Sequence, residues 1–310
     1  MKRWSVLILV LLILTTVNWV AVNPEVIALE NPTRNPLEWL DKLETEILGQ
    51  PTIGNLMDRL ATFEETMVGR IRDGSLVQRL AYLESLLYTN QPYDISVNYK
   101  LQALEWVIFR QVYAGALDGR VARLENALFG SVSAGPIASR LEKMVSQVFP
   151  GGTVNAHWTS VSEGTLVKVK IMDEISSARS QVGDSFRFMV METVVSNNMI
   201  IIPKGTVGYG KISKVTRPRN LGIDARLMLD FGEVRALDST PVALFLGAKA
   251  SDMNRSRQLA VGASTAGMLI LGPEGILIGM AVKGKEKTIP VDTEYFIQVK
   301  KPVRIYTLQK

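Results

Sequence analysis

The sequence contains no cysteine and a single histidine, His157. The chain therefore forms no disulfide, and without a lipid-bearing cysteine we expect that it is not a lipoprotein. Thiolate and histidine-based metal sites are excluded by count, and no nucleophile has a base beside it in the sequence. No Walker loop or dinucleotide fingerprint occurs. A turn between strands explains the acidic pair Asp173-Glu174 better than a catalytic or calcium pair does. The sequence predicts a non-enzymatic protein with no catalytic residues, cofactor, metal or small-molecule substrate.

The first thirty residues have the pattern of an export signal. Lys2 and Arg3 precede an unbroken apolar run from Val6 to Leu14, and Val26-Ile27-Ala28 fits a cleavage site. The apolar run lies far from Ala28, so an uncleaved anchor is the alternative, and a buried N-terminal helix is a third possibility. We expect residues 1–28 to be a signal peptide and the protein to be exported, either periplasmic or associated with the cell envelope.

Charge is distributed unevenly along the chain. Residues 152–310 carry 21 Lys and Arg against 14 Asp and Glu, whereas residues 1–151 carry 14 against 16. A basic C-terminal part suits an anionic membrane or an acidic envelope polymer, and it equally suits a solvated surface without a partner. Nucleic acid is not expected as a partner, because no basic stripe is interleaved with aromatic residues.

Residues 36–149 repeat a helical pattern about every 20 residues. Apolar residues recur at i, i+4, i+7 and i+11, which places them on one helix face. The copies are Leu40, Leu43 and Ile47 (partial); Leu56, Leu60, Phe63 and Met67; Leu76, Leu80, Leu83 and Leu87; Val97, Leu101, Leu104 and Ile108; Leu117, Val121, Leu124 and Leu128; and Ile137, Leu141, Met144 and Val148. Glycine-bounded connections separate the helices, and only Tyr88 to Tyr99 has irregular spacing. The pattern predicts short helical repeats, each of which packs mainly on its neighbours along the chain.

Charged residues recur with the same period of about 20 residues. Glutamates follow the third apolar position and Arg or Lys residues precede the second, at Glu44, Glu64, Glu84, Glu105 and Glu125 and at Arg59, Arg79, Lys100, Arg120 and Arg140. Within a copy the two charges are five residues apart, which is off the i, i+4 geometry. We therefore expect them to bridge neighbouring units. A long coiled coil is the alternative, although Gly and Pro51 interrupt the units and 20 is not a multiple of seven.

Residues 164–310 read as a β domain, and residues 150–163, rich in small and turn residues, as the linker to it. Strands are expected after Gly164-Thr165 and over Ser185 to Val195, Met199 to Ile202, Thr206 to Val215, Ala225 to Phe231 and Val242 to Leu246. Gly164-Thr165, Gly205-Thr206 and Asp292-Thr293 each place a turn-permissive residue before a strand. The predicted fold class is α+β with two domains, helical repeats followed by an antiparallel β-barrel or sandwich.

The order of these motifs resembles a known β-barrel. The order resembles that in the C-terminal barrel of conjugation and type IV secretion channel proteins. It runs Gly-Thr, a strand, an acidic turn with Ser176-Ser177, a strand, Ile-Pro-Lys-Gly-Thr at 202–206, a Gly-rich strand and Leu-Met-Leu-Asp-Phe at 227–231. The chain also resembles uncharacterised exported bacterial proteins with the same barrel and with Arg-Leu…Leu-Glu…Gly repeats. The likeness covers residues 164–248 and the strand near 295–299. This chain has a signal-like N-terminus and helical repeats where the channel proteins have a cytoplasmic tail and a proline-rich linker.

An apolar, glycine-rich insertion over residues 258–284 interrupts the β pattern. Pro273-Glu274-Gly275 divides it into two pieces, each too short to span a bilayer as a helix. Three interpretations of the insertion remain: a hairpin that packs on its own barrel, a hairpin that self-associates or dips into a membrane, and a loop that binds a ligand. In the channel proteins that the barrel resembles, a helical insertion meets the outer membrane. Basic residues at both ends suit an anionic surface. The candidate interaction residues are Gly262, Gly267, Gly272, Gly275, Gly279, Arg255, Arg257, Lys283 and Lys285.

Together these features predict an exported structural or interaction protein of the cell envelope. The helical repeats would be a spacer or partner-binding arm, and the β domain would be membrane-proximal or self-assembling. An envelope protein or a second copy of the chain is the expected partner. The alternative is a component of a secretion or conjugation-type channel.

Overall fold

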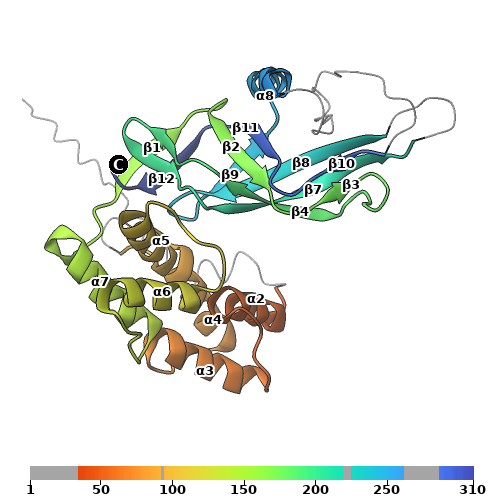
Figure 1. Ribbon diagram of the computed structural model, residues 1–310. Coiled ribbons are helices and arrows are strands. Elements are labelled where there is room, and N and C mark those ends of the chain that lie inside the picture. Colours follow the sequence, from red (N-terminus) through yellow and green to blue (C-terminus); the bar gives the residue numbers. More distant parts are fainter. Residues whose placement is uncertain (1–33, 92–93, 219–224, 262–285) are drawn as a thin grey trace, which may run out of the picture.

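The computed structural model describes residues 34–91, 94–218, 225–261 and 286–310, with only the backbone described for 257–261. Helices come first and a β-barrel follows, as the α+β prediction has it (Figure 1). The N-terminal elements are α2 (Pro36–Leu48), α3 (Leu56–Val68), α4 (Leu76–Tyr88), α5 (Val97–Phe109), α6 (Leu117–Phe129), α7 (Ile137–Val148) and the short 3₁₀ helix η1 (Pro150–Gly152). The periodicity of about 20 residues is confirmed by these bounds.

Capping residues set the helix ends. Asn35, Asn55, Ser75 and Ser96 accept a backbone N–H from the first turn of α2, α3, α4 and α5. Ser75 and Gln78 form the complete capping box of α4. Glycines at positive φ end α2, α3 and α6, so the chain reverses directly after each of these helices.

Buried glutamates join each unit to the next, as the charge spacing predicts. Each one accepts a loop N–H eight residues later and binds an arginine fifteen residues later. The ion pairs are Arg59–Glu44 at 2.5 Å and Arg79–Glu64, Arg120–Glu105 and Arg140–Glu125, each at 2.7 Å. The loop donors are Thr52, Arg72, Tyr113 and Ser133. Burying a carboxylate is tolerated here because both its oxygens have donors.

The irregular stretch between α4 and α5 breaks this pattern. Glu84 pairs with Arg34 at 2.9 Å instead of with the fourth unit. Lys100, which stands where the other units have arginine, pairs with Glu142 of α7. These two altered pairings lie on either side of the irregular stretch, and the predicted bridging is confirmed for four of the five glutamates.

The expectation that each helix packs mainly on its sequence neighbours holds for α4, α5 and α6 and is wrong for α2, α3 and α7. Helix α2 contacts α4 and α6, α3 contacts α7, and α5 contacts α7. Helix α5 buries Tyr99 and Trp106 as well as the predicted face with Leu101 and Leu104. A helix that is buried on several sides needs several neighbours, and α5 contacts α4, α6 and α7.

The C-terminal part forms a closed antiparallel barrel with the strand order β11-β2-β4-β7-β8-β9. Its strands are β2 (Leu166–Ile171), β4 (Ser185–Val190), β7 (Val207–Thr216), β8 (Arg226–Arg235), β9 (Pro241–Phe245) and β11 (Glu294–Val299). Phe186, Phe188 and Phe231 pack ring against ring in its core. Gly208 and Gly210 of β7 face the Phe188 and Phe186 rings, which a Cβ at either position would overlap.

Four barrel strands begin with the same turn. The third residue of each turn has positive φ and donates its N–H to a neighbouring strand, and that strand returns an N–H to the carbonyl of the fourth residue. The turns are 162–165 with Gly164 before β2, 181–184 with Gly183 before β4, 203–206 with Gly205 before β7, and 290–293 with Asp292 before β11. The predicted Gly-Thr and Asp-Thr strand starts are thereby confirmed, and Gly183-Asp184 is a fourth that the sequence reading missed.

Short strands extend the structure beside the barrel. They are β1 (His157–Val161), β3 (Ile175–Ser176), β5 (Val194–Ser196), β6 (Met199–Ile202), β10 (Thr288–Ile289) and β12 (Val303–Thr307). Strand β1 lies within the stretch expected to be a linker and pairs with β12. The expected strand from Ser185 to Val195 is two strands: β4 ends at Val190, opposite Val169 of β2, and β5 pairs with β6.

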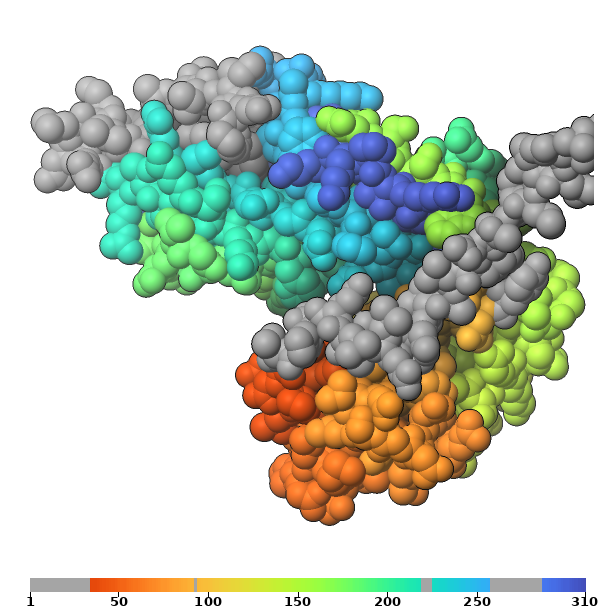
Figure 2. Space-filling model, turned by 180° about the vertical axis from the view of Figure 1, so that it is seen from behind, coloured from red at the N-terminus to blue at the C-terminus, as the bar shows by residue number. Residues whose placement is uncertain are grey.

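The helical part and the β part lie against each other (Figures 1 and 2), and segments beside the barrel complete the helical core. Ile200, Leu237, Tyr306 and Leu308 of the β part are buried in the same apolar cluster as the helices. Polar contacts accompany them, with distances of 2.8 Å from Val112 N to Lys204 O, 3.0 Å from Asn90 Nδ2 to Asp238 O and 3.2 Å from Gln102 Nε2 to Ser239 Oγ. The two parts are therefore packed together by apolar burial and by direct hydrogen bonds.

Candidate interaction site

Most of the candidate interaction residues lie outside the described part of the chain. These are Gly262, Gly267, Gly272, Gly275, Gly279, Lys283 and Lys285. Arg255 and Arg257 belong to helix α8 (Ala248–Val261), which occupies the entry to the insertion, where the sequence reading expected an apolar hairpin from residue 258. Arg255 is half-buried, and its Nε has no hydrogen-bond partner among the described residues.

Helix α8 is fixed to the outside of β11 by side chains that replace missing strand pairing. Asn254 Nδ2 donates to Phe296 O at 2.9 Å, and Phe296 N donates to Asn254 Oδ1 at 2.7 Å. On that side of β11, β9 pairs only with Gln298 and Val299. Asn254 therefore supplies the donor and acceptor that a strand would otherwise provide.

Gln298 holds the start of α8 in the same way. Its Oε1 accepts the N–H of Ala250 at 3.1 Å, and its Nε2 donates to Gly164 O at 3.3 Å. Gly247, just before the helix, sits so close to Gln298 that a Cβ there would overlap the amide. These contacts fix where the chain leaves the barrel for residues 262–285.

The return point of the insertion is fixed as well. After residue 285 the chain enters β10, which pairs with β3 through Thr288 opposite Ser176 and Ile289 opposite Ile175. Ser177 extends the pairing, because its N–H donates to Lys287 O at 2.8 Å and its Oγ accepts from Lys287 N at 2.9 Å. Both ends of residues 262–285 are thus held by the barrel.

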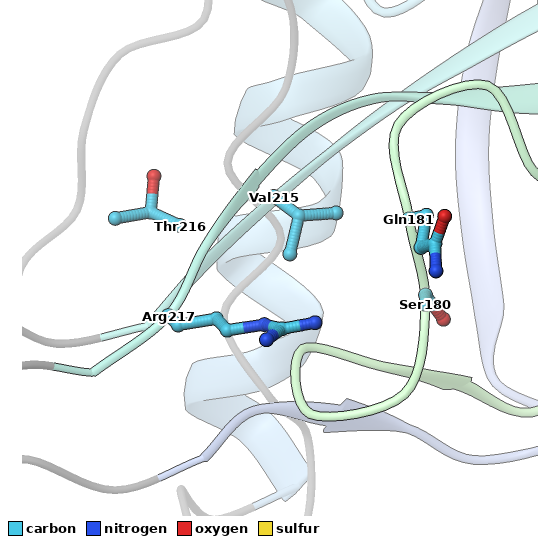
Figure 3. Close-up of a pocket in the computed structure, with 5 residues that line it drawn as sticks. All are labelled: Ser180, Gln181, Val215, Thr216 and Arg217. Atoms are coloured by element: carbon cyan, nitrogen blue, oxygen red, sulfur yellow. The ribbon is translucent and has the colours of Figure 1, made fainter.

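A shallow hollow of about 500 Å³ lies near this return point. Ser180 and Gln181, from the connection between β3 and β4, form one side, and Val215, Thr216 and Arg217, from the end of β7, form the other (Figure 3). Polar groups line it, and Val215 is its apolar residue. The hollow offers hydrogen-bonding groups and one guanidinium, which suits a polypeptide loop better than an apolar ligand.

Exposed cations gather along the outer part of the β7–β8 ribbon. Lys211, Lys214, Arg217 and Arg226 are exposed, and none forms an ion pair with a described residue. Figure 1 shows the far ends of β7 and β8 beside β3 and β10, at the end of the barrel away from α2–α7. The basic side chains and the return point of the insertion therefore share one end of the molecule.

The residues that sequence reading set aside as unreactive have structural contacts. Asp173 accepts the N–H of Arg187 at 2.7 Å and binds its guanidinium. The Arg187 side chain holds the pKa of the Asp173 carboxyl below its ordinary value, so this carboxylate is a fixed turn anchor. His157 is exposed on β1. In the described ranges, no group of three or more His, Cys, Asp or Glu residues is placed to hold a metal.

Among the helices that the structure describes, none combines the length and the apolar composition that a transmembrane span requires. No protein-family model matches the chain, and no curated protein matches it either. Among solved structures, the chain is similar to ComB10 of the Com type IV secretion system of Helicobacter pylori. The TM-score is 0.27 and the sequence identity 15%, over 46% of this chain and 88% of the ComB10 chain. Similarity at this level assigns no function.

Sequence reasoning missed the residues that anchor the insertion. Asn254 and Gln298 are polar residues whose partners lie 42 and 48 residues away, so no local pattern marks them. Helix α8 has no apolar stripe, since its sequence is mixed and polar, AKASDMNRSRQLAV. The one available signal was Gly247, a helix-preceding glycine after the β9 strand.

Proposed function

We propose that the protein is a non-enzymatic, exported component of the cell envelope. Its helical part is a spacer or partner-binding arm, and its basic barrel presents the glycine-rich insertion of residues 258–284 to an envelope partner or an anionic surface. The observation that carries the proposal is the anchoring of both ends of the insertion, by Asn254 and Gln298 on one side and by Ser177 on the other. A fixed entry and exit suits a segment that contacts something outside the barrel.

The charge distribution supports the same proposal. Lys211, Lys214, Arg217 and Arg226 lie without ion-pair partners in the described structure at the end of the barrel where the insertion returns. Basic side chains near a membrane each contribute about 1 kcal/mol of attraction to an anionic surface. An apolar segment framed by such residues gains from both burial and charge.

The proposal is tested by replacing residues 262–285 with a short Gly-Ser linker. The full-length protein and this variant are expressed in a Gram-negative host, and membranes are extracted with alkaline carbonate. We expect the full-length protein to stay with the membrane fraction and the variant to be released more readily. Equal release of both proteins would overturn the role of the insertion. A second variant, Ile53→Ser in a helix-part loop, controls for general effects of surface change.

A component of a secretion or conjugation-type channel is the second candidate function. The closed six-stranded barrel favours it, since the motif order at 164–248 resembles the barrel of those proteins. This candidate predicts a ring-shaped oligomer whose assembly needs the insertion. Electron microscopy of the extracted protein, with and without residues 262–285, separates the two functions.

A further inference from the structure

One loop between the helical repeats contacts the barrel, while two equivalent loops are exposed to solvent. Val112, Ile71 and Val132 occupy equivalent places in the loops after α5, α3 and α6, each two residues beyond the positive-φ residue that caps its helix. Val112 is 4% exposed against the barrel, whereas Ile71 is 53% and Val132 51% exposed. No described hydrogen bond involves the N–H of Ile71 or Val132.

The docked loop shows what such a loop binds. Val112 donates its N–H to Lys204 O at 2.8 Å, and the Val112 carbonyl lies against Gly205, where a Cβ would overlap it. Lys204 and Gly205 are the second and third residues of a strand-entry turn. A repeat loop therefore binds a turn that offers a carbonyl at its second position and a glycine at its third.

The two open loops lie next to each other. Gly69, which begins the loop of Ile71, is packed on Pro136 at the end of the loop of Val132, where a Cβ on Gly69 would be 2.6 Å from Pro136 Cγ. The contact between α3 and α7 holds this arrangement. The same relationship joins Gly49 to Ala116 beside the docked loop. The helical part thus repeats one arrangement of two adjoining loops: in the first pair only the loop of Val112 contacts the barrel, and in the second pair both Ile71 and Val132 face solvent.

Of the four strand-entry turns, one is both glycine-containing and open. The space beside Gly205 is filled by Val112, and Gly164 faces the Gln298 amide. The turn before β11 has Asp292 instead of glycine, and its Cβ blocks the approach of a loop carbonyl. No atom lies within 4 Å of the Cβ position of Gly183, and Val182 before it is 64% exposed. The hollow near Arg217 begins at Gln181, the first residue of this turn (Figure 3).

We propose that the loop of Val132, supported by the neighbouring loop of Ile71, binds the turn Gln181–Asp184 of a second copy of this chain. Val132 N donates to Val182 O of the other copy, and Gly183 admits the Val132 carbonyl, as Gly205 admits that of Val112. The two surfaces differ, so the contact is head-to-tail and leads to a ring or a filament. The proposal goes beyond the proposed function, because it uses no residue of the insertion.

The absence of cysteine allows a direct test by cross-linking. Full-length Val132→Cys and Val182→Cys proteins are treated with a short bismaleimide, separately and as a mixture. We expect cross-linked dimers in the mixture and a ladder of oligomers from the double variant, with little product from either single variant alone. The control partner is Ile53→Cys, which is fully exposed but lies in another loop. Equal yield with Val132→Cys and Ile53→Cys would overturn the proposal.

A second experiment does not depend on introduced thiols. Sedimentation velocity over a concentration series is expected to show association of the unmodified chain and a shift to monomer for Val132→Asp and for Val182→Asp. Ile53→Asp should associate as the unmodified chain does. A chain that stays monomeric throughout, or association that both Val132→Asp and Val182→Asp leave intact, would contradict the contact. Failure of the insertion function alone would leave this association unchanged and alter only the carbonate extraction.

Discussion

Val112 and Gly205 meet in a contact that joins the helices to the barrel. Val112 donates its N–H to the carbonyl beside Gly205, and its own carbonyl occupies the space where a side chain at Gly205 would stand. Gly205 has a φ of 89°, which L-residues rarely adopt. The position therefore excludes other residues both by backbone conformation and by the approach of the helical part.

Replacing Gly205 by alanine is expected to weaken this contact. Gly183→Ala is the matched control, because Gly183 has a φ of 97° in the same turn but open space around it. Backbone strain alone costs about 1 kcal/mol, so we expect Gly183→Ala to lose about that much and Gly205→Ala clearly more. Urea unfolding at low protein concentration measures both, and equal losses would contradict the close approach.

The glutamate–arginine bridges are expected to be costly to break singly. Arg79→Met leaves the buried Glu64 carboxylate with one loop N–H as donor, and removing one member of a buried ion pair costs about 3–5 kcal/mol. The double variant Arg79→Met/Glu64→Leu should be more stable than Arg79→Met, since no buried charge remains unpaired.

A double-mutant cycle from urea unfolding measures this coupling. Glu192→Gln, which removes the exposed partner of Lys168, is the control and should cost no more than about 1 kcal/mol. An Arg79→Met loss as small as that of Glu192→Gln would show that the bridges are dispensable.

Acid is expected to weaken the helical part through Glu125. Burial opposes its ionisation, but Arg140 and the Ser133 N–H outweigh burial and hold the pKa of Glu125 below the ordinary value of 4.5. A lowered folded pKa contributes stability that is present above pH 4.5 and lost as pH falls through the folded pKa. Unfolding midpoints from pH 7 to pH 3 should therefore fall less steeply for Glu125→Gln. An unchanged acid slope would contradict this assignment.

Asn254→Ala is expected to release α8 from β11. The change removes two hydrogen bonds to Phe296, and the loss of such bonds at a partly buried strand costs about 1–3 kcal/mol. Amide exchange at Phe296 should accelerate, since its N–H loses its acceptor. The control is Met253→Ala, a neighbouring exposed residue on the same helix. Unaltered exchange in Asn254→Ala would show that the helix is held by other contacts.

The repeats and the strand starts could be predicted because their signals are local. Apolar residues recur in the order that one helix face requires, and Gly205-Thr206 and Asp292-Thr293 mark turns by residue type alone. The bridging of Glu44 to Arg59 also followed from spacing, because a five-residue separation within one helix left neighbouring units as the remaining partners.

The arrangement of the helices and the anchoring of the insertion could not be predicted. Tyr99 and Trp106 lie off the apolar stripe of α5, yet both are buried. Asn254 reads as an ordinary surface residue until β11 is placed beside it. Strand β1 is short and mostly exposed, and its partner β12 lies about 145 residues later in the chain. These features depend on tertiary contacts, which a single sequence does not encode locally.

The location of the protein tests the central claim most directly. Cells that express the full chain are converted to spheroplasts, protease is added, and the N-terminus of the undigested protein is determined by mass spectrometry. We predict digestion in spheroplasts without lysis, with an N-terminus at Leu29 or, for an uncleaved anchor, at Met1. Protection from protease until the inner membrane is lysed would place the protein inside the cell and contradict the account.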